Sequence, residues 1–293
     1  MYEMLIRKKA LKIQERLGMR IGVMDGISKI PVAKTTEQAL EVIRELYKIG
    51  LKAFVLPKEL FYGIDTSTDL YKAKYGDLLR IKDLAKKYSI ELALRHPSLG
   101  DQPDETLRIF CNIASIMDCR TFIIRPTFYA QMPQDQALKL VVYKINEIMT
   151  SIGSDIKLGI ETTGRMNEVG SLEDVIDIVK RTTGTQPVLN WGQIHARGVG
   201  ALRSQADFKS IMDTVRRNIG SGCLQNAYFI FSGASYGPSG FIRGAPLDRS
   251  DMKLEYLIHE AMGLGARGTL IIDDPGKENY ILKNMENIGD MVR

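Results

Sequence analysis

The sequence has 293 residues, of which 44% are hydrophobic and 26% charged, and its formal net charge is +5. This length is typical of one (β/α)₈ barrel, and the composition argues against a disordered or fibrous chain. No apolar run approaches the roughly 20 residues of a membrane-spanning helix, and residues 1–16 mix acidic and basic side chains instead of forming a signal-peptide core. We therefore expect a cytoplasmic protein without a membrane partner.

Residues Tyr2–Leu17 have the pattern of an amphipathic helix, with Leu5, Leu11 and Leu17 among the apolar positions and basic side chains on other faces. We treat residues 1–18 as an N-terminal helical extension and residues 19–293 as one barrel domain. The extension could close the bottom of the barrel or contact a partner.

From residue 20 onward, short apolar runs alternate with longer stretches of helical periodicity, which indicates repeated βα units and a parallel sheet. No Gly-rich phosphate fingerprint follows the first run, so a closed barrel is favoured over an open doubly wound sheet. The predicted fold is an α/β (β/α)₈ TIM barrel with an extra N-terminal helix. Its eight predicted strands are 20–24, 53–57, 91–95, 121–125, 157–161, 187–191, 227–231 and 269–273.

The active site of such a barrel lies at the carboxyl ends of the strands, so the residues where each apolar run stops are the candidates for function. Many of these positions are polar. They are Arg95 and His96, Arg125, Glu161 to Thr163, Asn190 with Trp191 and Gln193, the run 228–232, and Asp273 with Asp274.

Several strand-end segments resemble those of the endonuclease IV family in its archaeal form. The fifth-strand segment LGIETTG (158–164) contains Glu161, where the family has a metal-bridging glutamate, and His96 before Pro97 matches the position of its first zinc histidine. The segments 188–198, 230–233 and 273–275 resemble the family's sixth, seventh and eighth strand ends. The resemblance implies a three-zinc site that hydrolyses the phosphodiester bond on the 5′ side of an abasic site.

This chain departs from that pattern at most of the ligand positions. Arg125 replaces a histidine, Asn190 an aspartate, Gln193 a histidine and Tyr228 a further histidine, and Arg243 with Gly244 lies where the family has another. A guanidinium has no lone pair to donate, and amide oxygens are weak zinc ligands. We expect no cofactor, or at most one divalent ion, zinc or manganese, on the residual ligands His96, Glu161 and Asp273. The alternative is that Arg125 forms an ion pair with Glu161 or Asp273.

Two further residues near the sixth strand have competing interpretations. His195 could replace a lost ligand, but it would point to the opposite side if the strand continued, so a hydrogen-bonded structural role is favoured. Trp191 is expected in the core or in a pocket wall, with stacking on a nucleobase as the alternative.

The loops that follow the later strands carry scattered arginines and tyrosines, an arrangement that suits contact with a nucleic-acid backbone. Solvated charges without a partner are the alternative. The candidate nucleic-acid-binding residues are Arg197, Arg203, Arg243, Arg249, Tyr129 and Tyr236, with Lys277 nearby.

Three functions therefore compete. The first is a barrel with a degenerate metal site that binds DNA (an abasic or damaged duplex) or a repair or replication protein, without catalysis or with altered activity. The second is an active abasic-site endonuclease with fewer metals, in which Glu161 is catalytic and divalent-dependent nicking disappears in Glu161→Gln. The third is a sugar isomerase or epimerase, which requires Glu161 and Asp273 to face one pocket.

Overall fold

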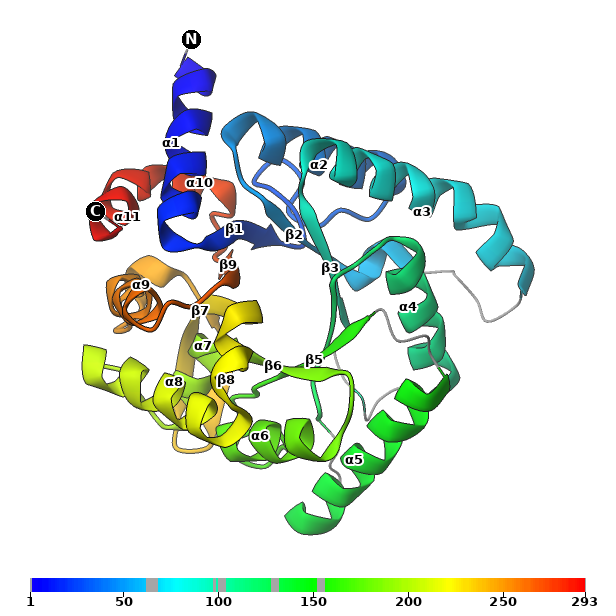
Figure 1. Cartoon of the computed structure of the whole chain (residues 1–293), viewed down its shortest axis with the longest axis vertical. Coiled ribbons are helices and arrows are strands. Elements are labelled where there is room, and N and C mark those ends of the chain that lie inside the picture. Colours follow the sequence, from blue (N-terminus) through cyan, green and yellow to red (C-terminus); the bar gives the residue numbers. More distant parts are fainter. Residues whose placement is uncertain are drawn as a thin grey trace.

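The computed structural model describes residues 2–61, 68–96, 99, 104–127, 132–151 and 156–292. Within these ranges, eight parallel strands form a closed barrel, since the pairing of β6 with β7 joins the two ends of the series. Figure 1 shows the helices arranged around these strands. The barrel strands are β1 (Met19–Met24), β2 (Ala53–Leu56), β3 (Glu91–His96), β4 (Thr121–Ile124), β5 (Lys157–Glu161), β6 (Thr185–Asn190), β7 (Ala227–Gly237) and β9 (Gly268–Asp273).

Each of the eight predicted strands is present to within a few residues, which confirms the predicted fold class. Two of the helices between the strands have clear capping residues. The Thr35 hydroxyl accepts the Gln38 N–H, Gly50 ends the same helix at φ 83°, and Ser171 with Asp174 forms a capping box. The helices are α1 (Tyr2–Leu17), α2 (Thr36–Ile49), α3 (Thr68–Tyr88), α4 (Asp104–Ile116), α5 (Gln134–Ser151), α6 (Leu172–Arg181), α7 (Trp191–Arg197), α8 (Gln205–Ile219), α9 (Leu254–Gly263), α10 (Glu278–Lys283) and α11 (Met285–Met291).

Helix α1 packs against its own barrel, beside α2 and α11 (Figure 1). Its apolar face buries Ala10, Ile13 and Leu17. The Gln14 side chain joins it to the barrel, because it donates to the Gly50 carbonyl and accepts the Ile21 N–H, both at 2.8 Å. The N-terminal extension is therefore a structural part of the outer helix ring. No helix within the described ranges is long and apolar enough to cross a membrane.

Side chains that point into the barrel form three layers, because successive residues of a strand alternate between its two faces. The middle layer is apolar and includes Val55, Ala93, Ile123, Val188 and Ile271. In several strands, the residue two positions after the middle-layer residue is polar and lies at the mouth of the barrel. The residue two positions before the middle-layer residue is also polar and lies at the floor. The mouth and the floor are thus separate polar regions with an apolar layer between them.

The structure corrects two features near the mouth. The sixth strand ends at Asn190 and the short helix α7 begins at Trp191, whereas the sequence suggested a strand that continued to residue 191. In addition, β7 extends to Gly237 and pairs in antiparallel fashion with β8 (Gly240–Ala245), a hairpin that the sequence analysis did not predict.

Candidate functional site

A cavity of about 390 Å³ opens at the carboxyl ends of the strands, and we call it the mouth cavity. It combines three basic side chains with amide, hydroxyl and carboxyl groups, and its lining includes the ends of five strands, β3, β4, β6, β7 and β9. Its lining residues are Arg95, Arg125, Asn190, Gln193, Ser232, Gly233, Phe241, Gly244, Ala245, Asp273, Asp274, Pro275 and Lys277.

A buried ion pair between Arg95 and Glu161 lies at the base of this cavity. The Arg95 guanidinium donates through Nε and Nη2 to the two carboxylate oxygens of Glu161, at 2.8 and 2.7 Å. The Asn190 amide donates a third hydrogen bond to Glu161 Oε1 at 2.8 Å. Burial raises the pKa of Glu161, but the charge and hydrogen bonds of Arg95 outweigh it and hold that pKa below its ordinary value. Glu161 is therefore a fixed carboxylate with both oxygens engaged.

The cation beside Glu161 is Arg95, and the expected ion pair of Arg125 with Glu161 or Asp273 is not formed. The Arg125 guanidinium instead lies 3.9 Å from Glu168. Among the described residues, its buried Nε has no hydrogen-bond partner. Burial is the main cause that lowers the pKa of Arg125. Arg125 thus lines the mouth cavity with its Nε–H unpaired among the described residues.

The two amides that replace metal ligands have different surroundings. Asn190 caps helix α7, since its Oδ1 accepts the Gln193 N–H at 3.2 Å and the Ser232 hydroxyl at 2.9 Å. Gln193 lines the cavity, and its buried Oε1 has no hydrogen-bond partner within the described part of the chain. Asn190 is thus held by several hydrogen bonds, whereas the Gln193 amide oxygen is buried and unpaired among the described residues.

Asp273 and Lys277 also line the cavity, and Asp25 lies close enough for the charges of both to act on it. Burial raises the pKa of Asp273 and of Asp25, and the charges of Arg95 and Lys277 only partly offset it. Lys277 donates from Nζ to the Met24 carbonyl at 2.9 Å. Asp25 and Lys277 have φ values of 66° and 51°, in the region that side chains other than glycine rarely adopt. Such strain is concentrated at functional sites in proteins.

The residual metal-ligand set does not converge. His96 follows Arg95 on β3 and therefore faces outward, where its ring packs edge-to-face on Phe110 of α4 at 4.8 Å between centroids. Glu161 is occupied by Arg95, and Asp273 alone faces the cavity. Within the described ranges, no group of three or more His, Cys, Asp or Glu side chains is arranged to hold a metal ion. The side chains present do not fit the zinc cluster of the endonuclease IV family.

Tyr228 and Trp191 lie outside the mouth cavity. Tyr228 is the second residue of β7 and lines a cavity at the floor of the barrel, so its mapping onto a mouth ligand is wrong. Trp191 is fully buried and packs on Phe208 and Phe229, at 5.1 and 5.5 Å between ring centroids. Its core interpretation is confirmed.

The candidate nucleic-acid residues divide into structural and exposed ones. Arg197 donates to the carbonyls of Arg165 and Glu168, at 2.6 and 2.9 Å, and so holds the loop after β5. Arg243 on β8 and Arg249 are exposed beside the mouth. Tyr129 lies outside the described residues.

Arg203 and Tyr236 belong to a cluster around Asp251. Tyr236 donates to Asp251 at 2.8 Å, and the Arg203 Nε lies 3.8 Å from the same carboxylate. Asp251 also contacts the buried His195 at 2.8 Å through Nε2, while the His195 Nδ1 accepts the Leu202 N–H at 3.0 Å. These bonds support the structural role of His195, although the reason given from the sequence was wrong because residue 195 is helical.

Comparison with known proteins shows which chains this one is similar to. No protein-family model matches the sequence. An uncharacterized protein of Methanocaldococcus jannaschii is 21% identical over 267 residues, which cover 88% of this chain and 94% of that protein. Among solved structures, SacUVDE has a TM-score of 0.69 at 14% identity and covers 93% of this chain and 99% of its own.

Two further solved structures are similar along nearly their whole length. D-psicose 3-epimerase from Clostridium cellulolyticum H10, solved with D-tagatose, has a TM-score of 0.60 at 11% identity, with 94% of this chain and 96% of that chain covered. A xylose isomerase domain protein from Planctomyces limnophilus has a TM-score of 0.63 at 10% identity, with 94% and 98% covered. The chain shares the (β/α)₈ barrel fold of these proteins. At these identities the likeness shows the fold alone.

Proposed function

We propose that this barrel binds nucleic acid at its mouth, with a phosphate group held in the mouth cavity by fixed cations in place of metal ions. The observation that carries the proposal is the bidentate Arg95–Glu161 pair. In this pair, the guanidinium is the cation beside the glutamate, where the endonuclease IV family would have a metal ion. The strand-end resemblance to endonuclease IV supports DNA, an abasic or damaged duplex, as the nucleic acid.

The groups left available in the cavity suit a phosphate. The Nε–H of Arg125 is unpaired among the described residues, and Lys277 also lines the cavity. Arginine and lysine recognise phosphate oxygens through charge-assisted hydrogen bonds. Asp273 would repel an anion when ionised, and burial raises its pKa above the ordinary value, which opposes that ionisation. The proposed phosphate donors are therefore Arg125 and Lys277.

The rim of the cavity supplies further positive charge for the flanking backbone. Arg243 extends from the β7–β8 hairpin, and Arg249 lies in the short 3-10 helix Leu247–Arg249 that follows it. Each phosphate contact releases counterions from the duplex, so binding of this kind weakens steeply as salt increases. Binding rather than hydrolysis is the proposed role because Glu161 is committed to Arg95.

The test is fluorescence anisotropy with a labelled duplex that contains one abasic site and with its undamaged counterpart, at several salt concentrations. Arg125→Gln should weaken binding about tenfold, equal to about 1.4 kcal/mol, and reduce the slope against salt. Arg216→Gln on α8, a half-exposed arginine of the outer ring paired with Asp213, is the matched control. Equal binding by the two variants, or no binding by the unaltered protein, contradicts the proposal.

A further inference from the structure

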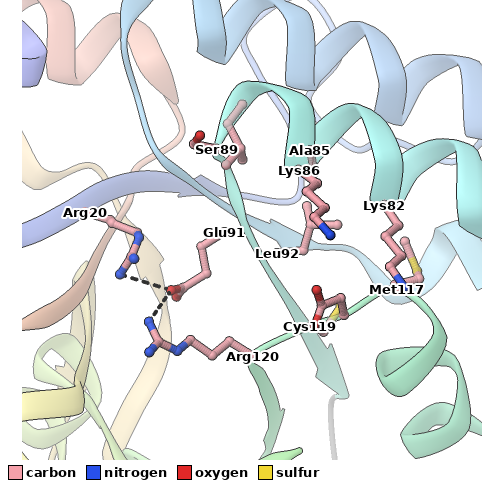
Figure 2. A pocket seen from close by; sticks show the side chains of 12 residues that line it. Arg20, Lys82, Ala85, Lys86, Ser89, Glu91, Leu92, Met117, Cys119 and Arg120 are labelled. Atoms are coloured by element: carbon pink, nitrogen blue, oxygen red, sulfur yellow. Dashed lines mark hydrogen bonds and ion pairs between the residues drawn. The ribbon is translucent and has the colours of Figure 1, made fainter.

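Another charged cavity of about 390 Å³ lies on the floor side of the barrel, near the amino ends of β1, β3 and β4 (Figure 2). It is distinct from the cavity that Tyr228 lines, although the two share Glu91 and Arg120. The apolar middle layer separates it from the mouth cavity. We call it the floor cavity and define it by Arg20, Lys82, Lys86, Glu91, Asp118 and Arg120, with Ala85, Leu92 and Met117 as apolar wall.

Two arginines share one carboxylate in this cavity. Arg20 and Arg120 approach Glu91 Oε2 from two sides, with N–O distances of 3.3 and 3.5 Å (Figure 2). The other oxygen of Glu91 accepts the Thr269 hydroxyl at 2.6 Å. The side chains of Arg20 and Arg120 are 42% and 58% exposed, against 9% for Glu91. Each guanidinium has five N–H donors, so most of them remain available on the open side.

Two lysines of α3 add to this charge. Lys82 and Lys86 lie one helical turn apart, and Figure 2 shows both side chains extending from α3 towards the cavity. Like charges at this spacing repel each other on a helix. Asp118 is the second acidic residue of the lining. The cavity thus has four cationic side chains and two carboxylates.

The helix ends that meet here do not cancel the excess positive charge of these side chains. Helices α3 and α4 end beside the cavity, and each C-terminus carries a partial charge of about −0.5. The net charge of the lining side chains and the two helix ends together therefore stays near +1. Their last carbonyls are partly satisfied, since Ala85 O accepts the Ile90 N–H at 2.9 Å and Ala114 O accepts the Cys119 N–H at 2.8 Å. Nearby, burial and the charges of Arg7 and Arg20 lower the pKa of Lys52. A positive potential remains at the floor.

We propose that the floor cavity is a binding site for a small phosphate-bearing anion, such as a phosphomonoester or pyrophosphate. Arg20 and Arg120 would offer parallel N–H donors to the phosphate oxygens, and Lys82 with Lys86 would close over them from the helix. The apolar wall would contact an organic substituent. This site is independent of the proposed nucleic-acid function of the mouth.

The experiment is isothermal titration calorimetry with pyrophosphate, and separately with inorganic phosphate, at low ionic strength. The double variant Lys82→Gln/Lys86→Gln should weaken pyrophosphate binding about tenfold or more. The matched control Lys87→Gln/Lys209→Gln, which removes the same charge from exposed helix positions outside the lining, should leave it unchanged. Circular dichroism of each variant verifies the fold.

Three results would overturn the proposal. These are absence of pyrophosphate binding by the unaltered protein, equal loss in the two double variants, and a loss that appears in Arg125→Gln instead of in Lys82→Gln/Lys86→Gln, which would assign the anion to the mouth. A failure of DNA binding by the mouth does not affect this result. Tighter binding of pyrophosphate than of inorganic phosphate would support a site for a polyphosphate or phosphoanhydride group.

Discussion

At the scale of single residues, the site depends on which cation neutralises Glu161. Both Arg95 and Arg125 stand at strand ends, and the structure pairs Arg95 with Glu161 while Arg125 lies near Glu168. A fully buried carboxylate without a partner is costly, so this one contact stabilises the folded protein and also prevents Glu161 from binding a metal.

Replacement of Arg95 by methionine should destabilise the protein at pH 7 by about 3 kcal/mol, because it leaves the Glu161 charge buried and unpaired. The folded-state pKa of Glu161 is below its unfolded value, so the stabilisation is complete above the unfolded pKa and disappears as pH falls through the folded one. Urea denaturation of Arg95→Met at pH 7 and at acidic pH measures both effects. Recovery in Arg95→Met/Glu161→Gln is expected, and a double variant as unstable as the single one would show that the pair is not responsible.

Restoring the family's ligands at Arg125, Asn190 and Gln193 should not by itself restore zinc binding. Arg95 would still occupy both oxygens of Glu161, so Arg125→His/Asn190→Asp/Gln193→His is expected to bind little zinc. Adding Arg95→Ser should raise zinc uptake, because it frees the carboxylate. Elemental mass spectrometry of the two variants makes the comparison. Equal zinc content would argue against the role assigned to Arg95.

At the scale of elements, the β7–β8 hairpin and α7 shape the mouth. The hairpin is attached to the loop after β5, since Phe241 donates its N–H to the Gly164 carbonyl at 2.8 Å and Met166 donates to Ser239 at 3.2 Å. The His195–Asp251 contact joins α7 to the segment before α9. These attachments place Phe241 and Gln193 in the wall of the cavity.

Gly240 is the point at which this attachment can be tested. Its φ is 89°, and a Cβ atom there would lie 2.1 Å from the Gly164 carbonyl oxygen. Gly240→Ala should therefore destabilise the protein by about 1–3 kcal/mol and weaken DNA binding at the mouth. Gly244→Ala in the same hairpin is the control, because its Cβ would meet open space. Similar unfolding midpoints for the two variants would contradict the close approach.

The burial of His195 in α7 predicts a dependence of stability on pH. Burial is the main cause that lowers the pKa of His195, so the unfolded chain takes up a proton at higher pH than the folded protein. The contribution of His195 to the free energy of unfolding is therefore fully present above the pKa of histidine in the unfolded chain, about 6.5, and decreases as pH falls below that value. His195→Gln should show a smaller decrease between pH 7.5 and 5.5. An unchanged pH profile in chemical denaturation would exclude His195 as the source.

At the scale of the whole molecule, the barrel was predictable because strand periodicity, helix caps and the alternation of the two are local properties. The hairpin was not, since Ile242 and Arg243 resemble a loop and their pairing with β7 depends on tertiary contacts. The site was predictable only as a set of strand ends. Apolar runs leave the start and the alignment of a strand uncertain by a residue or two. The sequence therefore could not show that His96 faces outward, that Tyr228 lies at the floor or that Arg95 reaches Glu161.

The apolar middle layer also has an electrical consequence. The layer between the two groups of charges consists of apolar side chains, which carry no hydrogen-bonding groups. Its members include Val55, Ala93, Ile123, Val188 and Ile271. The side chains of this layer therefore offer no chain of hydrogen bonds through which a proton or anion taken up at one end could rearrange the other. Charge still acts across the layer, since, in addition to burial, the charge of Glu161 at the mouth raises the pKa of Tyr228 at the floor, so a change of ligand at one face would be felt at the other as a change of potential only.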